Sequence, residues 1–281
     1  MILVFGKTGQ VACELQRQAE VVALGRDAAD LSDPAACAQA IRDSDATCVI
    51  NAAAYTAVDR AEDEEALATV INAASPSAMA QACAAKGIPF LHISTDYVFD
   101  GSGDAPWQVD DRVAPLNAYG RSKLAGEQGI AQAGGRYAIL RTSWVVSSHG
   151  NNFVKTMLRL SQTRDALTIV DDQIGGPTPA ADIAATLLRI AAPIGAGQGG
   201  GLYHYGGAPW VSWKDFACEI FAQAHRDVTV TGIASQDYPT PAARPRNSRL
   251  DCTRLRQDFG IEAPDWRAGL ARILSDLEAA R

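Results

Sequence analysis

The chain has 281 residues, of which 47% are hydrophobic and 20% are charged, and its formal net charge is −7. This length and composition predict a globular protein with an ample core, formed as one large domain or two smaller ones. The acidic balance and the lack of any basic cluster argue against a nucleic-acid partner or an anionic membrane surface. Any phosphate group that the protein binds must therefore be bound by a few residues of a local site and not by an extended basic surface.

Neither the cysteines nor the histidines are spaced as a ligand set. The six cysteines form no Cys-x-x-Cys pair and several lie within apolar patterns, as expected of buried side chains in a reducing compartment. The four histidines are scattered, so we predict no catalytic metal site. The chain opens on a predicted strand without a secretion signal, and no apolar run reaches the ~20 residues of a membrane span. We therefore expect a cytoplasmic protein that binds no membrane.

The first motif is a glycine turn between a predicted strand at 2–5 and a helical pattern at 11–19. Such a turn gathers free backbone N–H groups and the positive end of a helix dipole at one point, where a pyrophosphate can bind. Gly6 allows the turn, Gly9 allows backbone to approach phosphate, and Ala12 allows the helix to pack on the strand. The spacing is Gly-x-x-Gly-x-x-Ala, which also fits an ordinary strand-to-helix turn.

The residues after the second predicted strand, 21–24, bear on the choice of cofactor. A carboxylate at that point would bond the ribose 2′-hydroxyl of NAD, but this chain has Gly25-Arg26. Arg26 can meet a 2′-phosphate, which favours NADP. The alternative is a solvated loop arginine, and Asp27 and Asp30 keep NAD open.

Strands and helices continue to alternate as far as residue 145, which predicts a Rossmann-like, doubly wound parallel sheet in an α/β fold. Small residues follow the third strand at 51–54, where a flat ligand can lie against backbone, and polar residues follow the fourth at 94–96. We predict further strands at 47–50, 89–99 and 137–141, and helices at 35–42, 59–72, 75–86 and from 119.

The alternation weakens in the second half, where we predict a smaller α/β C-terminal substrate domain. The Rossmann domain is expected at 1–145, with about 181–200 returning to it, and the substrate domain at 146–180 and 201–281. The Gly-, Asp- and Pro-rich segment 100–115 is predicted to be a flexible loop that orders on substrate binding. Predicted elements are helices at 152–160, 182–190 and 213–224, strands at 167–170, 202–205 and 228–231, a turn at 175–179, and terminal helices.

Tyr119 and Lys123 are one helical turn apart, so their side chains share a face of the predicted helix. With Thr95 at a nearby strand end, they are the groups that a carbonyl reductase needs. Tyr119 would donate a proton to the carbonyl oxygen as hydride arrives, and Thr95 would hydrogen-bond the same oxygen. Lys123 would favour the phenolate and hold the nicotinamide ribose. Alone, a Tyr-x-x-x-Lys pair is common on helix surfaces.

The order of these motifs resembles the extended short-chain dehydrogenase/reductase family. Within it, the whole chain resembles the dTDP-4-dehydrorhamnose reductases. The matching segments are Gly6-Lys-Thr-Gly-Gln-Val11, Asn51-Ala-Ala-Ala-Tyr-Thr-Ala-Val-Asp59, Ser94-Thr-Asp-Tyr-Val-Phe99, Asn117-Ala-Tyr-Gly-Arg-Ser-Lys-Leu-Ala-Gly-Glu127, Arg141-Thr-Ser-Trp144 and Arg244-Pro-Arg-Asn-Ser-Arg-Leu250.

The resemblance implies reduction of the 4-keto group of dTDP-4-dehydro-L-rhamnose by NADPH or NADH, the last step of dTDP-L-rhamnose synthesis. Thr95, Tyr119 and Lys123 would be catalytic, and Asp96 and Trp144 would contact the dTDP-sugar. Arg244 and Asn247 are candidates for its diphosphate, on charge and position. The expected cofactor-binding residues are Gly6, Thr8, Gly9, Gln10, Val11, Arg26, Asp30, Leu31, Ala53, Ala54, Tyr55, Thr56, Tyr119 and Lys123.

Two departures from the family pattern matter. Gly25-Arg26 stands where members can carry an acidic residue, which tilts the expectation toward NADPH. Some members are thought to dimerise through Mg²⁺ held by glutamates, but here Glu14 is accompanied by Ala181 and Asp276. The role of Mg²⁺ is therefore uncertain, and we expect a monomer or a weak homodimer.

Two other functions compete with this reading. A nucleotide-sugar 4,6-dehydratase or epimerase shares the fold and the Tyr/Lys pair, but dehydratases carry Asp-Glu after the threonine, where this chain has Asp96-Tyr97. A non-catalytic NADP-binding regulatory subunit would be expected to lack the intact Tyr/Lys pair.

Overall fold

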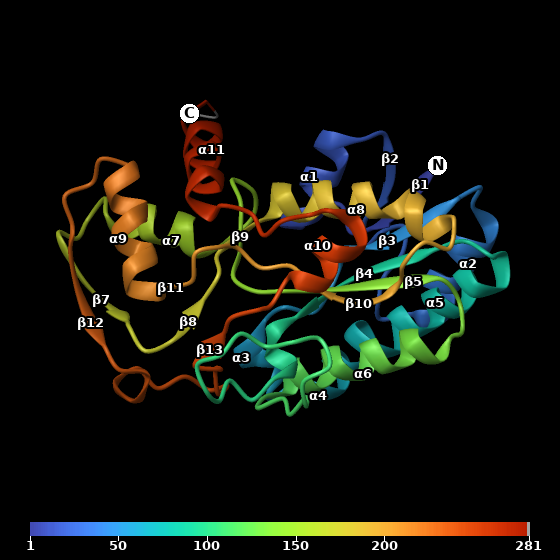
Figure 1. The fold of residues 1–281 in the computed structure, drawn as a ribbon, viewed down its shortest axis with the longest axis horizontal. Helices are drawn as coiled ribbons and strands as arrows, with labels where there is room; N and C mark the ends of the chain where they lie inside the picture. The colour runs from blue at the N-terminus through green and yellow to red at the C-terminus, as the bar shows by residue number, and fades with distance from the viewer. Residues whose placement is uncertain (280–281) are drawn as a thin grey trace.

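The computed structural model describes residues 1–279, and its centre is a six-stranded sheet in the order β10-β5-β4-β3-β1-β2 (Figure 1). All five strand pairs are parallel. The order reverses between β1 and β3, so the predicted doubly wound, Rossmann-like sheet is confirmed. The strands are β1 (Ile2–Phe5), β2 (Val21–Leu24), β3 (Cys48–Asn51), β4 (Phe90–Thr95), β5 (Tyr137–Thr142) and β10 (Gly201–His204).

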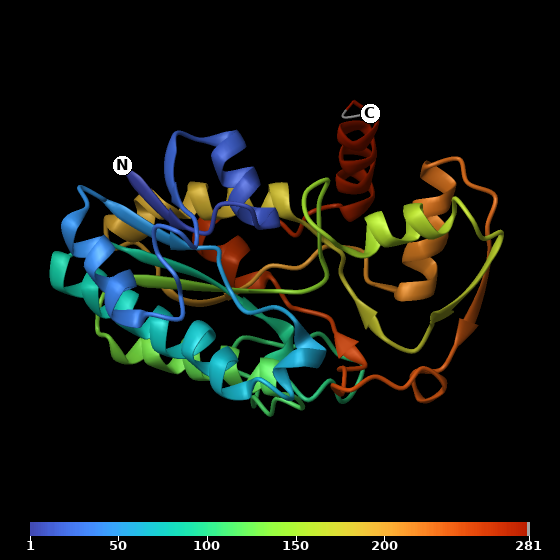
Figure 2. The same ribbon diagram turned by 180° about the vertical axis from the view of Figure 1, so that it is seen from behind.

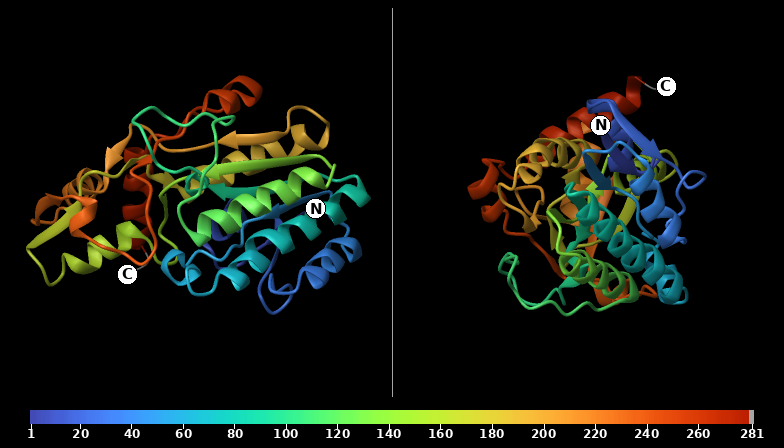
Figure 3. Two further views of the ribbon diagram at one scale, coloured as in Figure 1. Left: turned by 90° about the horizontal axis from the view of Figure 1, so that it is seen from below. Right: turned by 90° about the vertical axis from the view of Figure 1, so that its right-hand side faces the viewer.

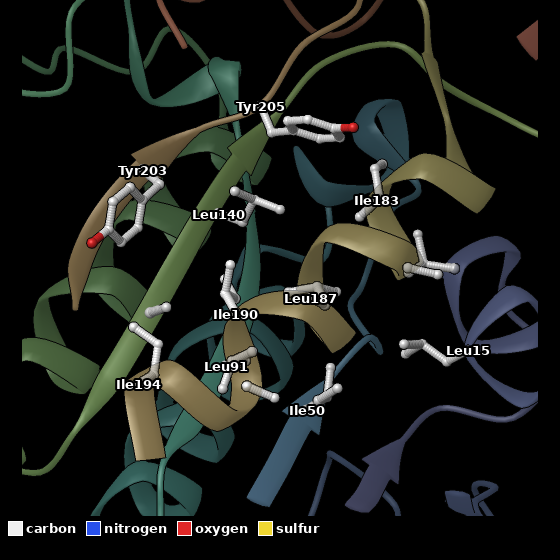
Figure 4. Close-up of a cluster of buried hydrophobic side chains, with 14 of the residues drawn as sticks. Leu15, Ile50, Leu91, Leu140, Ile183, Leu187, Ile190, Ile194, Tyr203 and Tyr205 are labelled. Atoms are coloured by element: carbon white, nitrogen blue, oxygen red, sulfur yellow. The ribbon is translucent and has the colours of Figure 1, made fainter. Parts of the chain in front are cut away.

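Helices cover both faces of this sheet because its strands send apolar side chains to each side. On one face, Leu15 of α1 (Gln10–Gln18) and Leu187 of α8 (Ala180–Gly195) pack around Ile50 (Figure 4). On the other, Phe5 packs with Met79 in a second cluster. The helices on that face are α2 (Pro34–Asp43), α5 (Ser75–Lys86) and α6 (Ala118–Gln132), seen from behind in Figure 2.

The predicted domain boundary at residue 201 is wrong for the segment that follows it. β10 pairs with β5 from Gly201 opposite Ala138 to His204 opposite Arg141, and so forms the edge of the main sheet. Helix α10 (Thr253–Phe259) places Leu255 in the core of the same sheet. Both segments therefore lie with the first domain, because their apolar side chains are buried there.

A smaller unit lies at the end of the sheet opposite α2 (Figure 3). It contains α7 (Phe153–Leu160), α9 (Trp213–Gln223) and α11 (Trp266–Ala279), and the paired parallel strands β7 (Ala166–Val170) and β12 (Thr229–Ile233). These elements share a core of their own around Phe216 and Trp266. The predicted turn at 175–179 instead contributes to two short strands, β8 (Ile174–Gly175) and β9 (Thr178–Pro179). β8 pairs with β11 (Val211–Ser212) and β13 (Asn247–Ser248), and β9 pairs with β6 (Val145–Val146).

The helix predicted at 59–72 is broken into three pieces. These are α3 (Val58–Ala61), α4 (Glu65–Thr69) and a π-helical turn at Val70–Ala74 that leads directly into α5. The π turn carries Asn72, whose amide bonds the backbone of Tyr55 and the Ser122 hydroxyl. Tertiary hydrogen bonds therefore decide the course of this segment.

The segment 100–115 is fixed to the rest of the protein in this structure, although its composition predicted a flexible loop. Trp107 stacks on Phe99 with ring centroids 4.5 Å apart, and its backbone N–H donates to the Arg249 carbonyl at 2.9 Å. The buried Asn247 amide donates to the Ala105 carbonyl at 2.7 Å. Ordering of this loop by substrate remains a prediction.

Candidate active site

A cavity of about 1040 Å³ opens at the carboxyl ends of the central strands. It is lined by the glycine turn after β1, by the ends of β2 to β5, by the first turns of α6, and by Trp213 from the smaller unit. It lies at the point where the strand order reverses, where doubly wound sheets bind ligands. Its volume is at the upper end of the ~300–1,000 Å³ typical of ligand sites.

The cavity brings together nearly all of the residues expected at the site. Arg244 and Asn247 do not line it. The residues that do are Gly6, Thr8, Gly9, Gln10, Val11, Arg26, Asp30, Leu31, Ala53, Ala54, Tyr55, Thr56, Thr95, Asp96, Tyr119, Lys123 and Trp144.

Arg244 and Asn247 make structural contacts instead. The Arg244 guanidinium pairs with Asp59 at 2.9 Å, which ties the segment before β13 to α3. Asn247 is 2% exposed, and its amide holds the 100–115 loop. Both side chains are thus engaged within the protein, and their contact with the diphosphate stays a prediction.

The glycine turn is shaped to receive a phosphate. Gly6 has φ +109°, and a Cβ there would lie 3.3 Å from the Ala52 carbonyl, so a side chain would be both strained and crowded. Gly9 caps α1 without a side-chain hydrogen bond to the first N–H groups. Those N–H groups remain available to an anion, as at other helix N-termini that bind pyrophosphate.

Two cations lie at the rim of the cavity beside Gly25. Arg26 and Lys7 are both exposed and both line the cavity. Sequence reasoning missed Lys7, although a lysine between the two glycines of the turn was a visible signal. Nearby, a hydrogen bond from the Ser32 N–H holds the pKa of the Asp30 carboxyl below its ordinary value. The rim thus offers cations for a phosphate and a carboxylate for a hydroxyl.

Thr95 and Tyr119 meet at the carboxyl end of β4. The side chain of Asn117 caps α6 by accepting from the Gly120 N–H at 2.8 Å, which fixes the first turn that carries Tyr119. Burial raises the pKa of Tyr119 to about 12, and a hydrogen bond from Thr95 partly opposes this shift. The phenol therefore keeps its proton at neutral pH, which is the form that can donate.

Lys123 is 1% exposed and lines the cavity with Tyr119, which lies one helical turn away on α6. Its Nζ is 2.7 Å from the Ile93 carbonyl oxygen and 2.9 Å from Nε2 of His92. Burial lowers the pKa of Lys123 to about 8, and the nearby Glu127 opposes this shift. Glu127 is itself paired with the buried Arg141 at 2.7 Å.

Asp96 is a buried carboxyl group in the cavity wall. Its Oδ1 accepts from the Thr95 hydroxyl at 3.2 Å, while Oδ2 has no hydrogen-bond partner among the described residues. Burial raises the pKa of Asp96 to about 7, against hydrogen bonds from Ser248 and Thr95. An unpartnered buried oxygen of this kind is suited to a hydroxyl group of a ligand.

Two tryptophans, one after β5 and one from the smaller unit, form a further wall of the cavity. The rings of Trp144 and Trp213 stack with centroids 3.5 Å apart and an angle of 11°. Trp144 has φ 48°, which is rare for a bulky residue, and a Cβ on Gly175 would lie 2.6 Å from its ring. Its ring is thus held between Trp213 and the Gly175 backbone. Trp213 was not predicted at the site, since 69 residues separate the two indoles.

A Rossmann-like sheet with a Tyr-x-x-x-Lys pair at the carboxyl ends of its strands defines an oxidoreductase of the short-chain dehydrogenase/reductase type. A family model described as the RmlD substrate binding domain matches residues 1–279. The chain therefore belongs to this family.

Named relatives and solved structures agree with that assignment. A dTDP-4-dehydrorhamnose reductase of Sinorhizobium fredii is 43% identical over 97% of this chain and 96% of its own, and one from Escherichia coli K12 is 42% identical over 98% and 97%. The reductase structure from Clostridium acetobutylicum superposes with a TM-score of 0.93 at 36% identity, covering 99% of each chain. The one from Bacillus anthracis, in complex with NADP, has a TM-score of 0.93 at 34% identity over 98% of each.

Proposed function

We propose that this protein reduces the 4-keto group of dTDP-4-dehydro-L-rhamnose to give dTDP-L-rhamnose, with NADPH as the hydride donor. Relatives of 42 and 43% identity carry the name of this activity, and a solved relative binds NADP. The observation that carries the proposal is that the Thr95, Tyr119 and Lys123 side chains line the same cavity as the glycine turn. A bound nicotinamide supplies the hydride.

The roles of the side chains follow from their protonation states. Tyr119 donates its phenolic proton to the substrate carbonyl oxygen, and the Thr95 hydroxyl hydrogen-bonds that oxygen as negative charge develops on it. The Lys123 ammonium stabilises the phenolate that remains and holds the ribose hydroxyls of the cofactor. Asp96 Oδ2 accepts from a sugar hydroxyl, and the Trp144 ring packs on the apolar face of the sugar.

Reduction is favoured over dehydration by the residue after Asp96. A 4,6-dehydratase needs a second carboxyl group there, because one must protonate the leaving hydroxyl and another take the α-proton, but this chain has Tyr97. The Tyr97 ring packs edge-on against Tyr119 with centroids 5.6 Å apart, and burial raises its pKa above the ordinary tyrosine value. It fills space beside the proton donor without supplying a carboxylate.

Turnover of the named substrate tests the proposal. We expect NADPH oxidation with dTDP-4-dehydro-L-rhamnose by the wild type and a roughly 10²–10⁴-fold loss of kcat in Tyr119→Phe. Tyr238→Phe is the matched control, because Tyr238 is 59% exposed and does not line the cavity. Tight NADPH binding without turnover would move the assignment to another sugar nucleotide or to a regulatory role.

A further inference from the structure

Behind the cavity wall lies a buried chain of polar groups that the proposed mechanism does not use. Asn51, the last residue of β3, is 1% exposed, and His92 on the neighbouring β4 is fully buried. The Asn51 amide contacts His92 Nδ1 at 3.1 Å, and His92 Nε2 contacts Lys123 Nζ at 2.9 Å. Neither Asn51 nor His92 lines the cavity.

Two backbone groups fix the direction of every hydrogen bond in this polar network: the Ala53 N–H at one end and the Ile93 carbonyl at the other. The Ala53 backbone N–H can only donate, and it lies 3.1 Å from Asn51 Oδ1, so the Asn51 Nδ2 group must face His92. Nδ2 can only donate, and His92 Nδ1 must therefore accept. The imidazole proton is then on Nε2, pointing at Lys123.

Lys123 consequently receives a hydrogen bond at the atom that should carry its charge. Its Nζ donates to the Ile93 carbonyl, which can only accept, and accepts from His92 Nε2–H. Only a neutral amine has the lone pair for this. An ammonium group would face an N–H donor, and moving the imidazole proton to Nδ1 would make it face the Asn51 amide protons instead.

We propose that Asn51 and His92 are positioning residues that stabilise the neutral amine of Lys123 in the free protein. Lys123 then takes up a proton from solvent when the cofactor ribose and the Tyr119 phenolate require an ammonium. The catalytic part of this inference rests on the proposed function. The charged group that acts on Lys123 from its own helix is Glu127, which is paired with Arg141 of β5. Tyr119 of the same helix and Asp96 after β4 are the titratable groups that line the cavity with it.

The tautomer of His92 tests the hydrogen-bond order without any substrate. In protein labelled with ¹⁵N in the imidazole rings, long-range ¹H–¹⁵N correlation distinguishes the two tautomers, and His92→Gln assigns the signal. We expect Nε2–H for His92. His204 is an internal reference for the other tautomer. Its Nδ1 lies 3.0 Å from the Trp107 carbonyl oxygen and must therefore carry the proton. An Nδ1–H tautomer or a charged ring at His92 overturns the inference.

The substitution Asn51→Asp should reverse the direction of the hydrogen bonds from residue 51 through His92 to Lys123, with almost no change in side-chain shape. A carboxylate accepts from both the Ala53 N–H and His92 Nδ1–H, so the imidazole proton moves to Nδ1 and Nε2 becomes an acceptor for an ammonium. We expect the basic limb of the kcat/KM pH profile to move up by about one pH unit or more, the scale of one hydrogen bond. His92→Gln keeps an N–H donor toward Lys123. This variant should leave the basic limb of the kcat/KM pH profile near its wild-type position.

The outcomes distinguish failure of the inferred hydrogen-bond order from failure of the proposed reductase function. A lower rate in Asn51→Asp with an unmoved limb and an unchanged tautomer would mean a purely structural role and overturn the inference. An Nε2–H tautomer in the wild type that becomes Nδ1–H in Asn51→Asp, in a protein without reductase activity, would refute the proposed function and leave the hydrogen-bond order standing.

Discussion

Arg26 lies exposed at the cavity rim, where a 2′-phosphate of NADPH would be met. Charge-assisted hydrogen bonds contribute ~1.5–3 kcal/mol, so Arg26→Ala should lower kcat/KM for NADPH by about 10–100-fold. The value for NADH, which has no such phosphate, should change little. Arg42→Ala is the control, because the Arg42 guanidinium bonds Gln39 on its own exposed helix face. Equal losses with both cofactors would contradict this role.

Asp96 makes the stability of the protein depend on pH. Burial raises its pKa from 3.8 to about 7, so the folded state holds the proton more tightly than the unfolded chain does. The contribution of this carboxyl to stability is therefore full below about pH 4 and is lost as the pH rises to about 7. Asp96→Asn cannot ionise, so its free energy of unfolding relative to wild type should rise over this interval.

The size of that change is bounded by the shift of about three pH units, or about 4 kcal/mol at ~1.4 kcal/mol per unit. Urea unfolding at about pH 4 and about pH 8 measures it, with the exposed Asp104→Asn as control. A difference between Asp96→Asn and wild type that is the same at both pH values would show that Asp96 does not keep its proton in the folded protein.

Local residue order was enough to predict the chemistry of Thr95, Tyr119 and Lys123, because each belongs to a short motif at a strand end or a helix start. It was not enough for Asn51 and His92. Their partnership depends on β3 and β4 being neighbours in register, which sets Asn51 opposite His92. The ion pair of Arg244 with Asp59 could not be predicted either, since the two residues are far apart in the sequence.

At the scale of elements, the Trp144–Trp213 stack joins the loop after β5 to the start of α9. Aromatic pairs of this kind are worth about 0.5–1.5 kcal/mol beyond their buried area. Removing Trp213 should release Trp144 from its left-handed backbone conformation. Trp213→Ala should therefore raise KM for the sugar nucleotide about tenfold, as expected for ~1.4 kcal/mol, with little change in KM for NADPH.

Near-UV circular dichroism gives an independent readout of the stack, because two closely stacked indoles couple. That coupled signal should vanish in Trp213→Ala and remain in Trp210→Ala, whose indole is 43% exposed and does not line the cavity. A rise in both KM values, or a coupled signal that survives in Trp213→Ala, would mean that the stack does not shape the substrate site.

Apolar periodicity predicted most helices and strands to within a few residues, because core packing and local pattern agree in them. The exceptions are elements that tertiary contacts decide. The π turn at 70–74 is as rich in small and apolar residues as the helices around it, and what sets it apart is tertiary: its Asn72 bonds Tyr55 and Ser122. β10 has the pattern of any short strand, so nothing local assigns it to the main sheet.

In the whole molecule, polar contacts hold the two units on either side of the cavity. Arg272 of α11 pairs with Asp182 of α8 at 2.8 Å, and the Gln10 side chain accepts from Ser147 and Asn152 at 3.0 and 2.9 Å. Gln10 therefore links the phosphate turn to the segment that leads into the smaller unit. This long-range arrangement follows from the folded chain as a whole, and no motif in the sequence encodes it.

The surface at which a metal-bridged dimer was considered has different chemistry in this chain. Asp276 is held by Arg17 through two hydrogen bonds, position 181 is an alanine, and Glu14 lies 3.4 Å from the His149 ring. Mg²⁺ prefers several oxygen ligands, whereas these positions carry an alanine and a carboxylate already paired with an arginine, which disfavours a metal bridge here.

We therefore expect the mass and the activity of the protein to be independent of Mg²⁺. Sedimentation should give the mass of one chain, or one weak self-association constant, in the presence of either Mg²⁺ or EDTA. Arg17→Ala combined with Ala181→Glu is the informative variant, because it frees Asp276 from its arginine and adds a carboxylate at position 181. A dimer that forms in this variant only with Mg²⁺ would show that the paired arginine and the alanine are what prevent bridging. A Mg²⁺-dependent dimer in the wild type would contradict the prediction.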